Sequence, residues 1–181
     1  MFPKEIDGVV VKEIRSTVDY GWGVLADFET LEKAIILSEI TEFSYDAFSG
    51  CTNLKNVEIP NTLKFMEDGT FYGCTSLESI TIPESVTSIG WGVFNGCTSL
   101  KNITIPNGVT YIGGCVFNGC TSLESIIIPS SVTNIGYNVV NGCTNLKNIY
   151  YTGTEAEWNA ITISSENEAL KNATITYNYG K

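Results

Sequence analysis

The chain contains no histidine, and this absence removes the commonest proton carrier and metal ligand from any site that it forms. Catalytic groups of the Ser-His-Asp and Cys-His types are therefore excluded. Basic residues are also scarce, since 10 Lys and Arg stand against 20 Asp and Glu, for a formal net charge of −10. Because nucleic acids and anionic lipid surfaces attract clustered positive charge, we expect neither as a partner.

Long hydrophobic runs are missing too. No apolar stretch approaches the roughly 20 residues that a membrane-spanning helix needs, so we expect no membrane insertion. The opening residues, MFPKEIDG, lack the apolar core of a signal peptide. No glycine-rich phosphate loop of the nucleotide-binding types stands between a strand and a helix. We therefore expect no enzyme, no cofactor and no metal site, although the many carboxylates leave a glycosidase-like pair open on composition alone.

A block of 23 residues recurs along the chain almost unchanged. It occupies residues 73–95, 96–118 and 119–141, with a looser copy at 50–72 and a partial copy that begins at Gly142. Self-similarity at a fixed short period is typical of a solenoid, in which each coil packs only on its neighbours. At 181 residues, the whole chain is then predicted to form a single repeat domain.

The pattern inside the block predicts two short strands per coil. Counted from the first glycine, position five is leucine, positions eight and ten are apolar, and proline follows at position eleven. Alternating apolar residues predict a half-buried strand, which the proline ends because it has no N–H to donate. A second extended piece ends at Ile89, Ile112 and Ile135. Phe71, Phe94 and Phe117 fill the return side, and Asn-Gly pairs close the coils because they tolerate positive φ.

The same pattern sets the limits of the array. Residues 27–49 fit it without the Gly-Cys start, and Val11 and Ile14 fit positions fourteen and seventeen if about six residues are inserted after them. Residues 1–26 are then an N-terminal cap with a loop, and the repeats occupy 27–152. In the C-terminal cap, residues 153–181, two capping boxes are predicted, Thr154 with Glu157 and Ser165 with Glu168. Residues 173–178 alternate like a last strand.

These features predict a mainly β protein with short helical turns, a right-handed solenoid with a cap at each end. We expect it to be a monomer.

Five of the six cysteines recur 23 residues apart: Cys51, Cys74, Cys97, Cys120 and Cys143. A straight column of thiols cannot close a tetrahedron around zinc. Stacked side chains also point the same way, although one strand spacing falls within the Cα range of a disulfide. We therefore interpret the column as structural, made of buried free thiols that act as small apolar residues. Cys115, outside the column, is the thiol that we expect to be exposed.

Charge alternates at position six, in the order Lys55, Glu78, Lys101, Glu124 and Lys147. Position seven alternates between Asn and Ser in step, so the underlying period is 46 residues, a duplicated pair of coils. In the stack every Lys is then predicted to lie beside a Glu, which stabilises one register. The alternative is a charged strip that binds a ligand.

Position nine varies where its neighbours do not, and it is our main candidate binding surface. Its residues are Glu58, Thr81, Thr104, Ile127 and Tyr150. Trp91 and Tyr137, at position nineteen, extend the candidate surface, and Phe65 and Tyr111 form a second aromatic set at position sixteen. The alternative is ordinary surface decoration or partial cover of the core.

The string L-x-x-I-x-I-P-x-x-V-T-x-I-G-x-x-x-F-x-G-C resembles the BspA-like leucine-rich repeats of bacterial surface proteins. The resemblance covers residues 27–152, and the tail YYTGTEAEWNAI is similar to the end of such arrays. It implies an extracellular or cell-surface protein, often adhesive or host-interacting, whose export signal and anchor would lie outside these residues. The predicted function is non-catalytic binding of a protein or a glycan. A structural spacer without a ligand is the alternative, and an enzyme comes third.

Overall fold

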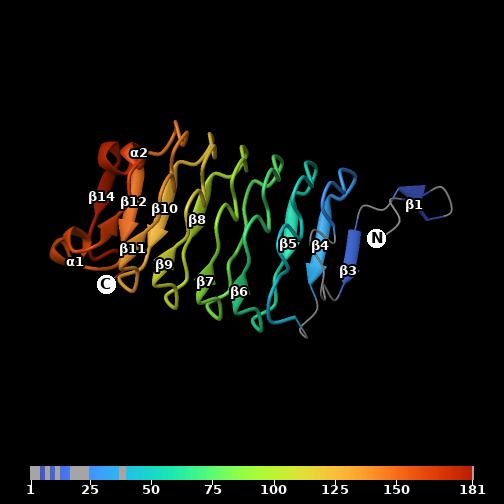
Figure 1. The fold of residues 1–181 in the computed structure, drawn as a ribbon, viewed down its shortest axis with the longest axis horizontal. Coiled ribbons are helices and arrows are strands. Elements are labelled where there is room, and N and C mark those ends of the chain that lie inside the picture. The colour runs from blue at the N-terminus through green and yellow to red at the C-terminus, as the bar shows by residue number, and fades with distance from the viewer. Residues whose placement is uncertain (1–4, 7–8, 11–12, 17–24, 37–39, 181) are drawn as a thin grey trace.

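The computed structural model describes residues 5–6, 9–10, 13–16, 25–36 and 40–180. The chain is wound into a stack of coils, with its two short helices at the C-terminal end (Figure 1). Every other regular element is a strand of two to four residues. The prediction of a mainly β solenoid with short helical elements is therefore confirmed.

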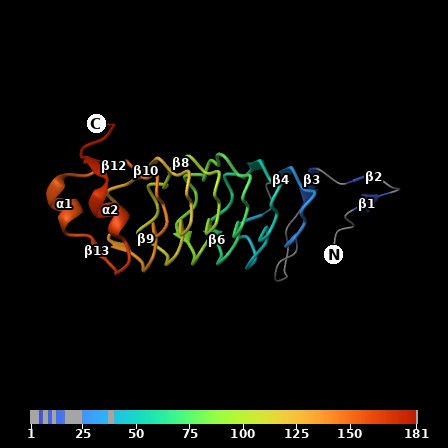
Figure 2. The same ribbon diagram turned by 90° about the horizontal axis from the view of Figure 1, so that it is seen from above.

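Two rows of parallel strands run along opposite sides of the stack (Figure 2). The front row contains β3 (Glu13–Ser16), β4 (Lys33–Ile36), β5 (Asn56–Glu58), β8 (Asn102–Thr104), β10 (Ser125–Ile128), β12 (Asn148–Tyr151) and β14 (Thr174–Thr176). The back row contains β6 (Phe65–Met66), β7 (Ser88–Ile89), β9 (Tyr111–Ile112), β11 (Asn134–Ile135) and β13 (Thr162–Ile163). An antiparallel pair, β1 (Glu5–Ile6) and β2 (Val9–Val10), precedes both rows.

The repeat length sets the register of both rows. In the front row Ile103 lies opposite Ile126, which lies opposite Ile149, and in the back row Ile112 lies opposite Ile135. Each pair is 23 residues apart in the sequence. Equivalent positions of adjacent coils are therefore neighbours, about 4.8 Å apart as in any β-sheet.

The front row is interrupted in one coil. No strand is assigned at residues 79–82, so the row divides into a three-stranded sheet, β3-β4-β5, and a four-stranded sheet, β8-β10-β12-β14. Val57 and Ile80 are only half-buried here, whereas Ile103 and Ile126 are buried. A cavity of about 280 Å³ lies between these coils. The strand predicted for this coil is therefore not formed, and the front-row ladder is open at this point.

The core consists of columns of identical side chains. Leu54, Leu77, Leu100 and Leu123 are fully buried one above the other. The rings of Phe48, Phe71, Phe94 and Phe117 stack nearly parallel, with centroids 5.2, 5.7 and 5.8 Å apart. Among the described residues whose burial is known, Thr70 and Asn167 are the buried polar side chains. A single coil buries too little to fold alone, so the stacked columns stabilise the array as a whole.

The N-terminal register differs from the prediction. β3 pairs with β4, and Ile14 lies opposite Ala34, which is position eight of its coil. Ile14 was expected at position seventeen, in the back row, and that prediction is wrong. The segment 13–16 has no proline or Gly-Cys start, and alternation of period two fits a front strand as well as a back strand. Val11 lies outside the described residues.

The C-terminal cap begins with α1 (Glu155–Asn159), whose predicted capping box is confirmed. The Oγ1 of Thr154 accepts a hydrogen bond from the backbone N–H of Glu157 at 3.3 Å. In return, Oε2 of Glu157 accepts one from the backbone N–H of Thr154 at 2.7 Å. The last predicted strand is also confirmed, since β14 lies within residues 173–178 and adds to the front row. β13 continues the back row in the same way.

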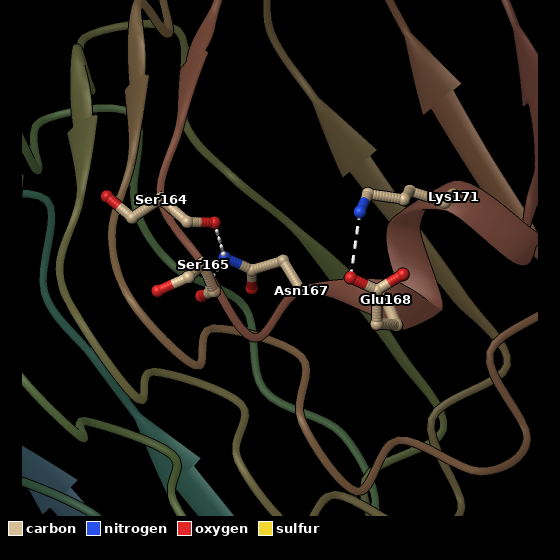
Figure 3. A network of polar contacts seen from close by, with 5 residues as sticks. All are labelled: Ser164, Ser165, Asn167, Glu168 and Lys171. Atoms are coloured by element: carbon tan, nitrogen blue, oxygen red, sulfur yellow. Dashed lines mark hydrogen bonds and ion pairs between the residues drawn. The ribbon is translucent and has the colours of Figure 1, made fainter.

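The second capping box, Ser165 with Glu168, does not form. Helix α2 (Glu168–Asn172) has Asn167 as its N-cap, so Glu168 is its first residue and not its third. The Asn167 amide donates to the carbonyl oxygens of Ser164 and Ser165, at 2.9 and 3.2 Å (Figure 3). It also donates to the carbonyl oxygen of Gly136 at 2.8 Å. Glu168 instead pairs with Lys171 at 2.7 Å. The buried Asn167 joins the cap to the coil of Gly136. The helix therefore starts after Asn167 and not after Ser165.

Candidate functional site

Position nine lies on the outer face of the front row. Glu58, Thr81 and Thr104 are exposed, whereas Ile127 and Tyr150 are half-buried. Glu58 is paired with Lys33 of the preceding coil at 2.8 Å. This candidate set therefore forms a mostly polar surface, and its one charged residue, Glu58, is held in an ion pair with Lys33.

Tyr150 has a structural partner. Its ring lies against that of Tyr179 in the C-terminal cap, with centroids 4.6 Å apart and planes tilted by 36°. The cap thus covers part of this side chain. The aromatic residue that made position nine attractive as a binding surface helps to hold the cap in place.

Trp91 and Tyr137 lie on the other side of the solenoid. Position nineteen follows the back strand by two residues in each coil, since β7 ends at Ile89 and β11 at Ile135. Trp91 is 50 % exposed and Tyr137 51 % exposed. The structure therefore separates the seven candidate residues into five on the front row and two beside the back row.

The back row carries a larger aromatic surface, which we call the aromatic side. It comprises Tyr45, Phe65, Tyr72, Trp91, Tyr111 and Tyr137, all exposed. Five of the six alternate between positions sixteen and nineteen from one coil to the next, and the repeat therefore places one exposed ring on every coil. Six of the eight large hydrophobic side chains that are exposed in the described residues belong to this set.

Sequence reasoning missed two members of this set. Tyr45 occupies position nineteen of the irregular coil 27–49, the position of Trp91 and Tyr137, so the repeat alignment contains the signal. Tyr72 stands at position twenty-three, where the regular coils have the Asn of an Asn-Gly pair. An aromatic residue at a position that is otherwise Asn departs from the repeat, and this departure could have identified Tyr72 from the sequence.

Tyr72 and Trp91 line a cleft with a volume of about 550 Å³. Its other lining residues are Ala26, Asp46, Ser49, Asp68 and Gly69. The lining residues come from three successive coils, 27–49, 50–72 and 73–95, and from Ala26 at the end of the N-terminal cap. Oδ1 of Asp68 accepts a hydrogen bond from the backbone N–H of Trp91 at 2.6 Å, which fixes the carboxylate beside the indole. The cleft therefore combines two exposed rings with two carboxylates.

One glycine makes room for the ring of Trp91. A Cβ atom at Gly114 would lie 3.0 Å from Cδ1 and 3.2 Å from Nε1 of Trp91. The indole of Trp91 thus leans over the next coil, in a space that only glycine leaves open.

Negative charge is crowded beside the cleft. Partial burial raises the pKa of Glu67, and the neighbouring carboxylates of Asp68 and Glu42 raise it further. The charge on Glu67 in turn raises the pKa of the Tyr45 hydroxyl, with smaller contributions from burial and Asp68. Repulsion between neighbouring carboxylates thus contributes to the Glu67 shift, and the charge of Glu67 is the largest contribution to the Tyr45 shift.

The front row shows the opposite electrostatics. Nζ of Lys101 lies 2.8 Å from Oε2 of Glu78, and this hydrogen-bonded ion pair lowers the pKa of Glu78 and raises that of Lys101. One position along, Oγ of Ser125 donates to Oδ1 of Asn102 at 2.7 Å. Among the described residues, position six forms one such ion pair and position seven one such hydrogen bond, while Lys55 and Glu124 act on Glu78 and Lys101 through their charge alone.

The cysteine column is buried, and its thiols are free. Each thiol donates to a backbone carbonyl 26 residues earlier, as from Cys97 to Phe71 at 3.2 Å. Burial raises the pKa of Cys143 to about 12 and those of Cys74, Cys97 and Cys120 as well. Nucleophilic chemistry from this column is disfavoured, because a thiol reacts as its thiolate.

Cys115 is buried as well, so the prediction that this thiol is exposed is wrong, although its exposed fraction of 5 % is the largest among the six cysteines. It occupies position twenty, where the chain turns with φ of 57°. Gly92 and Asn138 have the same backbone conformation at this position. Their occurrence in the other coils suggested an exposed turn, but the turn closes against the core.

Among the described residues, no group of three or more Cys, Asp or Glu side chains is arranged to hold a metal ion. Within the same residues, neither helix has the length and apolarity needed to cross a bilayer. The buried oxygens Ser44 Oγ and Asn138 Oδ1 have no hydrogen-bond partner in the described structure.

Comparison with known proteins gives the family. Residues 24–147 match the BspA type leucine rich repeat region in six copies. The structure of the Treponema pallidum leucine rich repeat protein TpLRR has a TM-score of 0.69 and 32 % identity, covering 81 % of this chain and 66 % of that one. A leucine-rich repeat protein from Bacteroides ovatus has a TM-score of 0.69 and 34 % identity, covering 78 % of this chain and 35 % of that one.

A more distant relative shares the fold. The pneumococcal vaccine antigen PcpA has a TM-score of 0.65 and 19 % identity, covering 92 % of this chain and 41 % of that one. This chain therefore spans between about a third and two thirds of the length of these related structures. No curated protein sequence matches it. The six matched repeats cover more than half of the chain, which belongs to the BspA-type leucine-rich repeat family.

Proposed function

We propose that the chain is a non-catalytic recognition module of a bacterial cell-surface or secreted protein, and that it binds a protein or a glycan through the aromatic side. The family supports the general class, a repeat module of bacterial proteins. One observation carries the proposal further, namely the exposed aromatic side chain on each successive coil of the back row. Large exposed apolar surfaces on a soluble fold are typical of interaction sites.

The scaffold suits recognition. Its coils are held by stacked rings and parallel ladders, so the aromatic side is presented without reordering of the backbone. Tyr and Trp offer large contact areas at a small cost in side-chain entropy, and they are enriched at sites that dominate binding energy. The same rings also fit the apolar faces of sugars.

A binding screen with two matched variants tests the proposal. The purified chain is screened against mucin glycans, extracellular-matrix proteins and bacterial wall polymers. The aromatic-side variant replaces Trp91, Tyr111 and Tyr137 with Ser, and the front-row variant replaces Thr81, Thr104, Ile127 and Tyr150 with Lys. Circular dichroism and thermal melting first show that both variants fold.

We expect a ligand that binds the parent and the front-row variant and loses at least tenfold in affinity for the aromatic-side variant. Loss of binding only in the front-row variant would move recognition to position nine. Binding by none of the three proteins would favour the alternative function, a structural spacer that extends a longer chain.

A further inference from the structure

We infer that the cleft between Tyr72 and Trp91 binds a cationic side chain, the guanidinium of Arg or the ammonium of Lys, from a basic protein segment. This inference rests on the proposed recognition function and names the chemistry of its ligand. The cleft combines two features that a cation requires, exposed aromatic faces and carboxylates, and it lies in a chain of net charge −10.

The aromatic part of the cleft is built for stacking. Tyr72 is 44 % exposed and Trp91 is 50 % exposed, so both rings present surface to a ligand. Neither ring makes a ring–ring contact with another side chain in the part of the chain that the structure describes. A guanidinium or ammonium group over a Trp or Tyr face is attracted by the ring quadrupole, and Arg in addition stacks its plane on the ring.

The carboxylates favour a cation over a neutral sugar. Asp46 and Asp68 line the cleft, and no Lys or Arg is among its lining residues. Asp68 uses Oδ1 for the N–H of Trp91, which leaves Oδ2 for a donor of the ligand. Hydroxyl groups could also donate to these oxygens, but only a positive charge would offset their repulsion.

The surroundings of the cleft strengthen this preference. Glu67 lies close enough to both Asp68 and Glu42 for its charge to interact with theirs. Anionic glycans and phosphate groups would be repelled by such a surface, whereas a basic segment would be attracted to it over a distance of several ångströms. The volume of about 550 Å³ exceeds what one guanidinium needs, so neighbouring residues of the segment also fit.

The test uses two synthetic peptides that differ only in charge. One is acetyl-Gly-Arg-Gly-Arg-Gly-amide, and the other carries citrulline, the uncharged isostere, in place of both arginines. Each is titrated into the ¹⁵N-labelled chain while the indole N–H signals are followed, with the Trp91 signal assigned by its loss in Trp91→Phe. We expect a saturable shift of the Trp91 signal with the arginine peptide alone, and weaker binding as salt is added.

Matched variants distinguish binding at the cleft from a general attraction of the peptide to the negative net charge of the chain. Asp68→Asn keeps the oxygen that accepts the Trp91 N–H but removes the charge, and Asp46→Asn keeps a residue that tolerates its positive φ of 55°. Glu124→Gln removes the same charge from the front row. We expect each Asp variant to weaken peptide binding at least threefold and Glu124→Gln to leave it within a factor of 1.5, roughly the screening of one distant charge.

Equal shifts with both peptides, or equal losses in all three variants, would overturn the inference. A sugar or an uncharged protein segment that shifts the Trp91 signal while the arginine peptide does not would also overturn it. That last result would leave the proposed recognition function intact, so the two claims fail separately.

Discussion

The front and back rows of this solenoid are built from the same repeat, yet their surfaces differ. On the front row the side chains contact their neighbours, as in the Glu78–Lys101 ion pair between coils and the tilted ring contact of Tyr150 with Tyr179 of the cap. On the back row Phe65, Trp91, Tyr111 and Tyr137 are exposed and make no ring–ring contact within the described structure. Side chains of the front row thus hold the register of the coils and the position of the cap. The exposed rings of the back row remain accessible to a ligand.

Successive coils approach each other closely through glycines at the end of the back-row strands. A Cβ atom at Gly113 would lie 2.5 Å from the carbonyl oxygen of Gly90, and one at Gly136 would lie 2.7 Å from the backbone N of Gly114. Successive coils thus touch through backbone atoms just before position nineteen. This close contact holds the aromatic residues at a fixed spacing.

The largest expected effect tests that contact. We predict that Gly113→Ala lowers the free energy of unfolding by about 1–3 kcal/mol, because the added methyl group overpacks against the backbone of the preceding coil. Thr104→Val is the control, since it keeps side-chain size and β-branching on the exposed front row, and it should change stability by less than about 0.5 kcal/mol. Urea unfolding measures both, and equal stability of the two variants would contradict the asymmetry.

A second prediction compares one tyrosine from each row. Tyr150→Thr should cost about 1 kcal/mol, because the ring of Tyr179 loses its partner and the cap loses cover. Tyr111→Thr should cost less than about 0.5 kcal/mol, because its exposed ring packs on little. Thermal melting of the two variants measures the difference. A larger loss of melting temperature for Tyr111→Thr than for Tyr150→Thr would contradict the proposed difference between the two rows.

A third prediction concerns pH. The pKa of Glu67 is raised in the folded state, mainly by burial and then by Asp68 and Glu42, so ionisation of Glu67 disfavours folding. Its unfavourable contribution is absent below the ordinary Glu value of 4.5 and develops as pH rises through the folded pKa. Glu67→Gln should therefore raise the melting temperature at pH 7 and leave it unchanged at pH 3.5.

The control for Glu67 is Glu124→Gln, on the front row, where Glu124 helps to keep Lys101 charged. That change should give no gain in stability at pH 7. A gain of the same size in both variants would show that relief of net charge, and not local crowding beside the cleft, explains the result.

The smallest expected effect lies at the front-row ion pair. Glu78→Lys places like charges beside Lys101, and it should lower the melting temperature slightly in low salt. The loss should shrink as sodium chloride is added, because exposed charges are screened. The double change Glu78→Lys with Lys101→Glu restores opposite charges within the pair but sets like charges beside Lys55 and Glu124, so it should recover only part of the loss in melting temperature. An effect that is independent of salt would mean that the pair acts through packing.

Much of the fold follows from the sequence because glycine, proline and leucine fix the period. The Leu100 and Phe94 columns are predictable, since each apolar position recurs with the same neighbours before and after it. Ile14 was misplaced because a four-residue alternating segment without proline fits either row. The second helix start was misplaced because Asn167 is held by the distant Gly136, a contact that local capping rules do not include.

The candidate site was only partly predictable. Repeat alignment selects Trp91 and Tyr137 as exposed aromatic residues, but it does not show that they lie on the opposite side from Thr104. The cleft depends on residues from three coils and the N-terminal cap, and its Asp46 and Tyr72 belong to copies that depart from the consensus. Burial of Cys115 was missed because a turn residue with positive φ was assumed to face solvent.

The measurement that tests the central claim most directly is hydroxyl-radical footprinting by mass spectrometry, on the chain alone and with the ligand identified in the screen. In the free chain Trp91, Tyr111 and Tyr137 should be oxidised faster than Tyr150. Addition of the ligand should protect residues of the aromatic side and leave Ile127 and Tyr150 unchanged. Protection of Ile127 and Tyr150, with Trp91 and Tyr111 still oxidised at the free rate, would contradict the claim that the back row is the recognition surface.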